Sequence, residues 1–136
     1  MIWKLATTSK ELKRFMWGYK MSKTPEQLKL ESIMGYCYGT EHYYRNQLLP
    51  FLYTDGVKTF VENAGGGAFW FLTECMAYTV KAKYFTSIKL KVKDSKGIIL
   101  VDDQEKKEIP YTDCPDGEWE FFYEPESKVL MWRGEY

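Results

Sequence analysis

The hydrophobic periodicity of this sequence changes at Ser87, and that change constrains the fold more than any other feature. Before Ser87 apolar residues recur at helical spacing, whereas residues 88–93, IKLKVK, alternate apolar and charged side chains. Alternation with a period of two predicts a half-buried strand whose lysines face water. Further strands are expected at 98–101, 118–123 and 129–132, and the short turns between neighbouring segments, at 94–97 and 125–127, predict antiparallel pairing.

Four helices are expected ahead of this sheet. Thr24 at the N-cap, Pro25 at the first helical position and Gln27 three residues after the cap predict a helix that ends near Gly35. The other three are expected after Ser9, at 57–63 behind Thr54-Asp55-Gly56, and at 68–80, which is apolar on nearly all sides and therefore predicted to be central and buried. For residues 36–50 the sequence does not decide between a short strand and a loop.

Helices followed by strands predict an α+β fold, in which N-terminal helices pack on a C-terminal antiparallel β-meander of about four strands. A length of 136 residues fits a single domain over 1–136. Within it we expect a basic helical N-terminal extension at 1–33, a central helical part at 34–86 and the antiparallel sheet at 87–136.

Composition argues against several classes of protein. No apolar run approaches the roughly 20 residues that span a bilayer, and the first residues do not resemble a signal peptide. Cys37, Cys75 and Cys114 form no CxxC pair, which argues against a disulfide framework or structural zinc. We therefore expect a cytoplasmic protein without membrane contact, metal or cofactor. Aromatic residues make up 18%, more than a core of this size encloses, so some are expected at the surface.

Charge is divided unevenly along the chain. Residues 1–93 hold 14 Lys/Arg and 7 Asp/Glu, whereas residues 94–136 hold 5 and 12. This asymmetry predicts oppositely charged faces suited to holding a partner. Aromatic residues are interleaved with the basic residues of the arm at 1–29. The arm is either a surface that binds nucleic acid or a protein partner, or a solvated helical face. Its candidate contacts are Lys10, Lys13, Arg14, Trp17, Lys20 and Lys23. The acidic end either imitates a phosphate backbone or pairs in part with the lysines of 88–93.

The densest polar cluster lies between residues 39 and 56 and is the candidate binding face. In a functional interpretation His42 is a general base oriented by Glu41 or Asp55, and Arg45 holds an anion. In a structural interpretation Asp55 or Thr54 caps the next helix, Arg45 pairs with a carboxylate and the tyrosines pack. Without a second histidine or an obvious nucleophile the structural interpretation is favoured, and no catalytic residue is assigned. The residues of this face are Glu41, His42, Tyr43, Tyr44, Arg45, Tyr53 and Asp55.

Three further patterns carry less weight. Cys37 lies five residues before His42 and would allow a Cys–His pair, but a free cysteine is more often a small buried hydrophobe. One histidine among scattered acids matches no metal-ligand spacing. The glycine run at 65–67 precedes a helix and could present N–H groups to a phosphate. It lacks the GK[ST] ending and follows no strand, so a helix C-cap and hinge is expected.

Several motifs recur together in one known family. They are GTEHYYR (39–45), YTDGV (53–57), the helix that contains Trp70, IPYTD (109–113) and the terminal Glu135-Tyr136. As a set they resemble a small uncharacterised bacterial and phage family, a domain of unknown function, from about residue 35 to 136. The resemblance implies that 39–57 is the functional face and that the chain comes from a phage or another mobile element. It implies no activity, and the arm at 1–33 is an addition to the pattern.

These observations favour a non-enzymatic protein-binding module from a phage or mobile element, such as an inhibitor of a host defence nuclease of the anti-CRISPR kind. The expected partner is a host defence effector or its nucleic-acid complex. Two alternatives stay open. One is a small enzyme that uses Glu41, His42, Arg45 and Asp55, and the other is nucleic-acid binding through the basic aromatic arm at 1–29.

Overall fold

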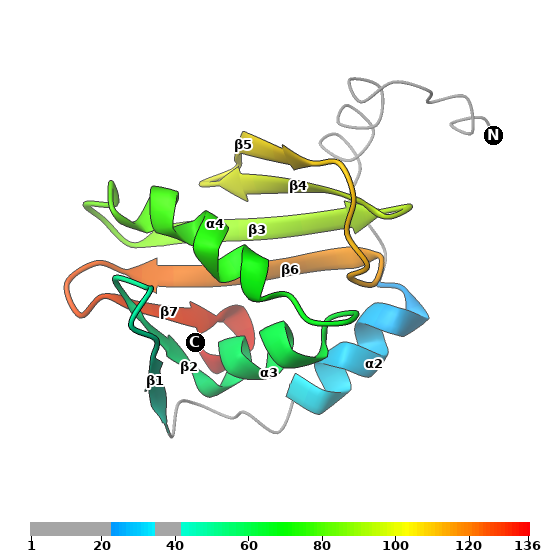
Figure 1. The fold of residues 1–136 in the computed structure, drawn as a ribbon, viewed down its shortest axis with the longest axis horizontal. Coiled ribbons are helices and arrows are strands. Elements are labelled where there is room, and N and C mark those ends of the chain that lie inside the picture. The colour runs from blue at the N-terminus through cyan, green and yellow to red at the C-terminus, as the bar shows by residue number, and fades with distance from the viewer. Residues whose placement is uncertain (1–22, 35–41) are drawn as a thin grey trace.

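The computed structural model of the chain describes residues 23–34 and 42–136 (Figure 1). The predicted helix after Ser9, Glu41 and the arm contacts other than Lys23 lie outside these residues. Within them the helices are α2 (Pro25–Met34), α3 (Asp55–Asn63) and α4 (Phe69–Thr79). The strands are β1 (Tyr43–Arg45), β2 (Leu52–Thr54), β3 (Thr86–Lys93), β4 (Lys96–Val101), β5 (Gln104–Ile109), β6 (Gly117–Glu124) and β7 (Val129–Trp132), and a 3-10 turn, η2, follows at Arg133–Glu135.

All seven strands form one sheet in the order β1-β2-β7-β6-β3-β4-β5. The pairing is antiparallel except between β2 and β7, which run parallel. The α+β class is thus confirmed, but a four-stranded antiparallel meander is wrong. Only β3-β4-β5 is a meander, because after β5 the chain returns to pair β6 with the free side of β3. The order of helices before strands is also wrong, since β1 and β2 lie between α2 and α3.

The core lies on one face of this sheet, where α3 and α4 pack in front of the strands in Figure 1. Alternation on β3 places Ile88, Leu90 and Val92 on this face, as predicted, and all three are fully buried. The rings of Phe60 and Phe71 lie 5.1 and 5.0 Å from that of Phe121. Together with Trp119, whose ring centroid lies 5.4 Å from that of Phe60, they form one aromatic cluster between the helices and β6.

Helix α4 covers the core with one side only. Phe71, Leu72 and Cys75 are fully buried, whereas Phe69, Thr73 and Ala77 of the same helix are exposed. The prediction of a central buried helix was wrong because apolar composition alone does not show that one side of this helix faces solvent. None of the helices in the described ranges is both long and apolar enough to cross a bilayer.

The lysines of β3 lie on its opposite face. They were predicted to face water, but the structure pairs two of them with carboxylates. Lys89 pairs with Asp103 at 2.9 Å, and Lys91 lies 3.8 Å from Glu118 on the neighbouring strand. The Lys91 side chain is only 11% exposed. The predicted pairing between the basic and acidic parts of the sequence is thus found on this face. Positive charges of β3 and negative charges of β6 lie side by side here. The basic and acidic parts of the sequence therefore do not form separate charged regions on this face of the sheet.

Helix α2 begins as predicted, because the Thr24 hydroxyl accepts a hydrogen bond from the backbone nitrogen of Gln27 at 3.1 Å. The Gln27 side chain instead reaches β6, where its amide nitrogen donates to the Glu118 carbonyl and its oxygen accepts from the Glu118 nitrogen. Gln27 thereby makes the backbone hydrogen bonds that a neighbouring strand would make at this end of β6. Gly117 is required beside it, because a Cβ on that residue would coincide with the Gln27 side chain.

Candidate functional site

Three of the predicted site residues meet where β1 passes the first turn of α3. Asp55, the first residue of α3, accepts a hydrogen bond from the His42 backbone nitrogen at 3.0 Å and one from the Tyr44 hydroxyl at 2.7 Å. The Nδ1 atom of His42 lies 3.5 Å from the same carboxylate. Asp55 therefore fixes both the backbone and a side chain of the β1 segment, and it lies where an orienting partner of His42 would lie.

Tyr53 extends this group across the strand pair. It lies directly opposite Tyr44 in the β1–β2 register, and the two ring centroids are 5.8 Å apart. The ammonium group of Lys58 lies 5.2 Å from the centroid of the Tyr44 ring and also pairs with Glu62 at 2.8 Å. The predicted packing of the tyrosines is found here, with a cation over one of the rings.

Tyr43 and Arg45 point to the other face of β1, because successive side chains of a strand alternate. Both are exposed, and Tyr43 retains 58% of its accessible surface. The structure therefore does not bring Arg45 into the group around Asp55. Of the predicted arm contacts only Lys23 is described, and it is an exposed residue that pairs with Glu31 at 2.8 Å.

The first turn of α3 is capped by Glu135, which sequence reasoning did not predict as a cap. The backbone nitrogen of Gly56 donates to Oε2 of Glu135 at 3.1 Å, and the Thr54 hydroxyl donates to Oε1 at 2.5 Å. Thr54 occupies the N-cap position but makes no side-chain cap bond to the helix. The expectation that Thr54 or Asp55 caps α3 was therefore wrong, because the cap comes from a residue distant in the sequence.

The comparison with known families can now be set beside this geometry. Residues 28–136 match DUF6876, a family of unknown function. The chain belongs to the DUF6876 family. No curated protein and no solved structure is significantly similar to it. The match confirms the resemblance to a domain of unknown function and extends it toward the N-terminus into α2, so Leu30 and Met34, which belong to the core, fall within the family region.

The motifs of this DUF6876 chain contact one another in the folded protein. Asp55 of YTDGV binds the strand of GTEHYYR, and Glu135 of the terminal pair binds YTDGV. Asp113 of IPYTD accepts a hydrogen bond from the backbone nitrogen of Gly66 at 2.8 Å. That N–H group is therefore already bonded to a carboxylate of the chain itself. The glycine run follows Ala64, the C-cap of α3, and leads into α4; Gly65 has a φ of 60°, as is common just past a helix C-cap.

Nucleophile and metal chemistry find little support in the described part of the DUF6876 chain. Cys75 and Cys114 are buried, and burial raises the pKa of both thiols. A raised pKa disfavours the reactive thiolate. Cys37 lies outside the described residues, so the structure does not test whether it lies near His42. Among residues 23–34 and 42–136 no three His, Cys, Asp or Glu side chains form a group that could hold a metal ion.

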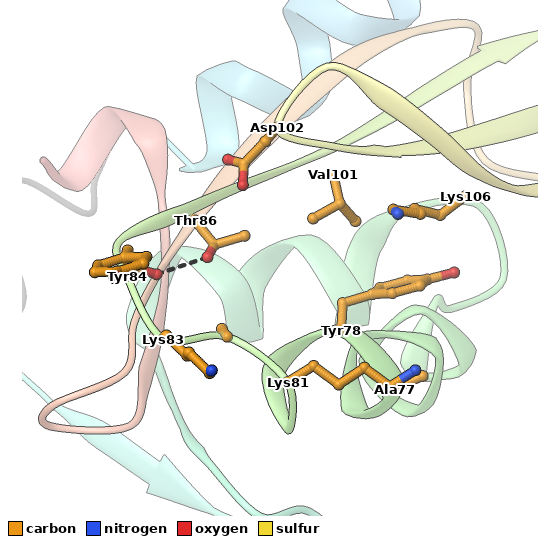
Figure 2. A pocket seen from close by; sticks show the side chains of 10 residues that line it. Ala77, Tyr78, Lys81, Lys83, Tyr84, Thr86, Val101, Asp102 and Lys106 are labelled. Atoms are coloured by element: carbon orange, nitrogen blue, oxygen red, sulfur yellow. Dashed lines mark hydrogen bonds between the residues drawn. The ribbon is translucent and has the colours of Figure 1, made fainter.

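A cavity of about 430 Å³ lies beyond the C-terminal end of α4, and no sequence motif pointed to it. Figure 2 shows lining side chains that come from the last turn of α4, the segment that follows it, and β3, β4 and β5. Sequence reasoning missed this site because its residues come from two stretches of the DUF6876 chain, 77–86 and 101–106, and carry no motif.

Proposed function

We propose that this chain is a non-enzymatic protein-binding module whose contact surface is the outward face of β1 and the turn that follows it. The observation that carries the proposal is the exposure of Tyr43 and Arg45 on a short edge strand and of Leu48, which is 73% exposed, in the turn after it. Tyrosine and arginine are enriched among the residues that dominate binding energy at protein interfaces.

The two edges of the sheet differ in a way that supports β1 as the contact. The edge strand β5 reads QEKKEI, and its first four residues are exposed and mostly charged. Charged side chains on an edge strand disfavour pairing with another chain. The edge strand β1 reads YYR and exposes one tyrosine and one arginine, with the second tyrosine half-buried. Of these two edges, β1 is the one suited to a protein partner.

Asp55 supports the proposal by holding this surface in one conformation before binding. Its carboxylate bonds to His42 and Tyr44, the residues on either side of Tyr43. The following turn is held by Asn46, whose side chain accepts from the Leu48 nitrogen at 2.8 Å. A surface that is ordered in the free protein loses less conformational entropy on binding.

For the partner we propose a host defence effector, such as a nuclease that the chain inhibits. This part of the proposal is supported by the sequence resemblance to a family of bacteria and phages and by the small size of the chain. The comparisons name no protein of known function, so the phage setting and the anti-CRISPR role stay predictions.

Co-purification tests the contact surface. We expect the tagged wild-type chain to retain a specific partner that the double variant Tyr43→Ala/Arg45→Ala loses. Tyr111→Ala is the matched control, because Tyr111 is 71% exposed and belongs to the loop after β5. The proposal fails if the double variant captures the same proteins, in the same amounts, as the wild type and the control.

The small-enzyme alternative keeps one specific observation in its favour. His42 is 67% exposed at its side chain, and its Nδ1 atom lies 3.5 Å from Asp55. A carboxylate at that nitrogen is the arrangement that orients a histidine as a general base. In a stably folded His42→Ala variant, an unchanged biological effect would exclude this alternative, whereas loss of the effect with partner binding retained would favour it.

A further inference from the structure

The cavity beyond α4 combines cationic, aromatic and apolar walls. Its floor in Figure 2 is the last turn of α4, and β4 and β5 lie across from that turn. The apolar lining is provided by Ala77, Ala82 and Val101. The polar lining consists of Tyr78, Lys81, Lys83, Tyr84, Thr86, Asp102 and Lys106. A volume of about 430 Å³ lies within the range of small-molecule sites in proteins.

The lysines of this cavity lack a carboxylate partner, unlike Lys23, Lys58, Lys89, Lys91 and Lys107. Lys81, Lys83 and Lys106 form no ion pair with any described residue, whereas Lys58 and Lys89 each hold a carboxylate oxygen within 3 Å. All three lysines are exposed, so water screens part of their mutual repulsion, but their combined positive charge at one cavity attracts anions. The arrangement therefore favours an anionic ligand.

The single carboxylate of the lining, Asp102, is already engaged by the backbone. Its Oδ1 atom accepts a hydrogen bond from the Ser87 nitrogen at 3.0 Å, and its own backbone nitrogen donates to the Ser87 carbonyl at 2.9 Å. Asp102 thus closes the turn between β4 and β5 onto the start of β3. It does not pair with the lysines of the cavity.

Helix electrostatics explain part of this charge but not all of it. Lys81 and Lys83 follow the C-terminus of α4, where positive charge is favourable beside the helix dipole. Lys106 comes from β5 and has no such explanation. Its neighbour Lys107 forms an ion pair with Glu74 of α4 at 3.0 Å, so β5 is joined to the helix without Lys106.

Aromatic surface completes the site. The ring of Tyr78 is half-buried in the wall of the cavity, and in Figure 2 it lies between Lys81 on the helix side and Lys106 on the strand side. Tyr84 stands at another side of the cavity and is 81% exposed. Aromatic rings stack on the flat faces of nucleobases whatever the base, and lysines bind phosphate as point charges.

We propose that this cavity binds a nucleoside monophosphate, with the base against Tyr78 and the phosphate among Lys81, Lys83 and Lys106. The site is separate from the proposed protein contact, because β1 and β5 are the two opposite edges of the sheet. The inference therefore does not depend on the proposed function.

The test is a titration of the labelled protein with adenosine monophosphate, adenosine or inorganic phosphate, followed by amide and side-chain NMR shifts at low salt. We expect adenosine monophosphate to shift the resonances of Tyr78, Lys81 and Lys106 and to bind more tightly than either fragment. Lys81→Gln/Lys106→Gln should weaken its binding about tenfold or more, which corresponds to about 1.4 kcal/mol. Tyr78→Phe should retain binding, and Tyr78→Ala should weaken it.

Lys96→Gln is the matched control, because Lys96 is an exposed lysine at the far end of β4. The proposal is overturned if adenosine monophosphate shifts no resonance of the cavity. It is also overturned if inorganic phosphate binds as well as the nucleotide, since the site would then hold an anion without recognising the base. If Lys96→Gln weakened the binding of adenosine monophosphate equally, the loss would reflect the overall charge of the protein, and the proposal would be overturned as well.

Discussion

Oε2 of Glu135 accepts a hydrogen bond from the backbone nitrogen of Gly56 at 3.1 Å, so the turn after β7 closes the first turn of α3. The same contact accounts for the glycine, because a Cβ at position 56 would lie 2.5 Å from Oε1 of Glu135. Oε1 also accepts from the Trp132 nitrogen at 3.0 Å. One carboxylate thereby joins β2, α3 and β7, the elements that support the β1 surface.

Replacing Glu135 should therefore destabilise the whole fold. In Glu135→Ala, the nearly buried Thr54 hydroxyl and the Gly56 nitrogen lose a charged acceptor. We expect the free energy of unfolding, measured with urea, to fall by about 2 to 4 kcal/mol. Glu126→Ala, at an exposed position in the β6–β7 turn, should change it by less than about 0.5 kcal/mol. Similar small losses in both variants would show that the Glu135 cap contributes little.

Gly117 offers a test of how α2 is attached to the sheet. Gly117 has a φ of 153°, and a Cβ there would overlap the Gln27 side chain that pairs with Glu118. We expect Gly117→Ala to lower the free energy of unfolding by at least about 2 kcal/mol, through overpacking and an unsatisfied strand end. Gly97→Ala is the control, because a Cβ at Gly97 meets its neighbours no closer than 3.4 Å. Equal losses in the two variants would contradict this role of Gln27.

The loop that carries Asp116 predicts a pH dependence. Burial raises the pKa of the Asp116 carboxyl above its ordinary value, although the Asp94 nitrogen donates to it at 3.1 Å. The native state therefore binds this proton more tightly than the unfolded chain does. The resulting stability is present below the unfolded pKa of about 4 and is lost as pH rises through the native pKa.

Asp116→Asn removes this titration while keeping an oxygen for the Asp94 nitrogen. We expect the wild type to gain stability relative to Asp116→Asn as the pH is lowered from 7 to 4, measured by urea unfolding at several pH values. A difference that stays constant, or that shrinks toward pH 4, would contradict the raised pKa of Asp116.

Local patterns predicted the elements whose signals lie within a few residues. Thr24-Pro25 marked the start of α2, and the alternation at 88–93 marked β3 and its buried face. Strand β5 was missed because an edge strand exposed on most of its length has no apolar alternation to show. Strands β1 and β2 are only three residues long, so β1 was left undecided between strand and loop and β2 was missed.

Long-range partners were beyond local patterns. Gln27 stands where a capping-box residue would stand, yet it pairs with Glu118, 91 positions away. Glu135 contacts Gly56 across 79 positions. The proximity of Asp55 to His42 was considered from the sequence because only 13 positions separate them. The cavity at Tyr78 and Lys106 gave no signal, because it forms only when β5 lies beside the end of α4.

Site-specific photo-crosslinking is the most direct test of the proposed binding surface. A photoreactive phenylalanine derivative replaces Tyr43 in one variant and Tyr111 in another, and both are irradiated in cells of the producing organism. The account predicts a discrete protein adduct from position 43 and none of the same mass from position 111. No adduct from position 43, or the same adduct from both positions, would contradict a protein-binding surface on β1.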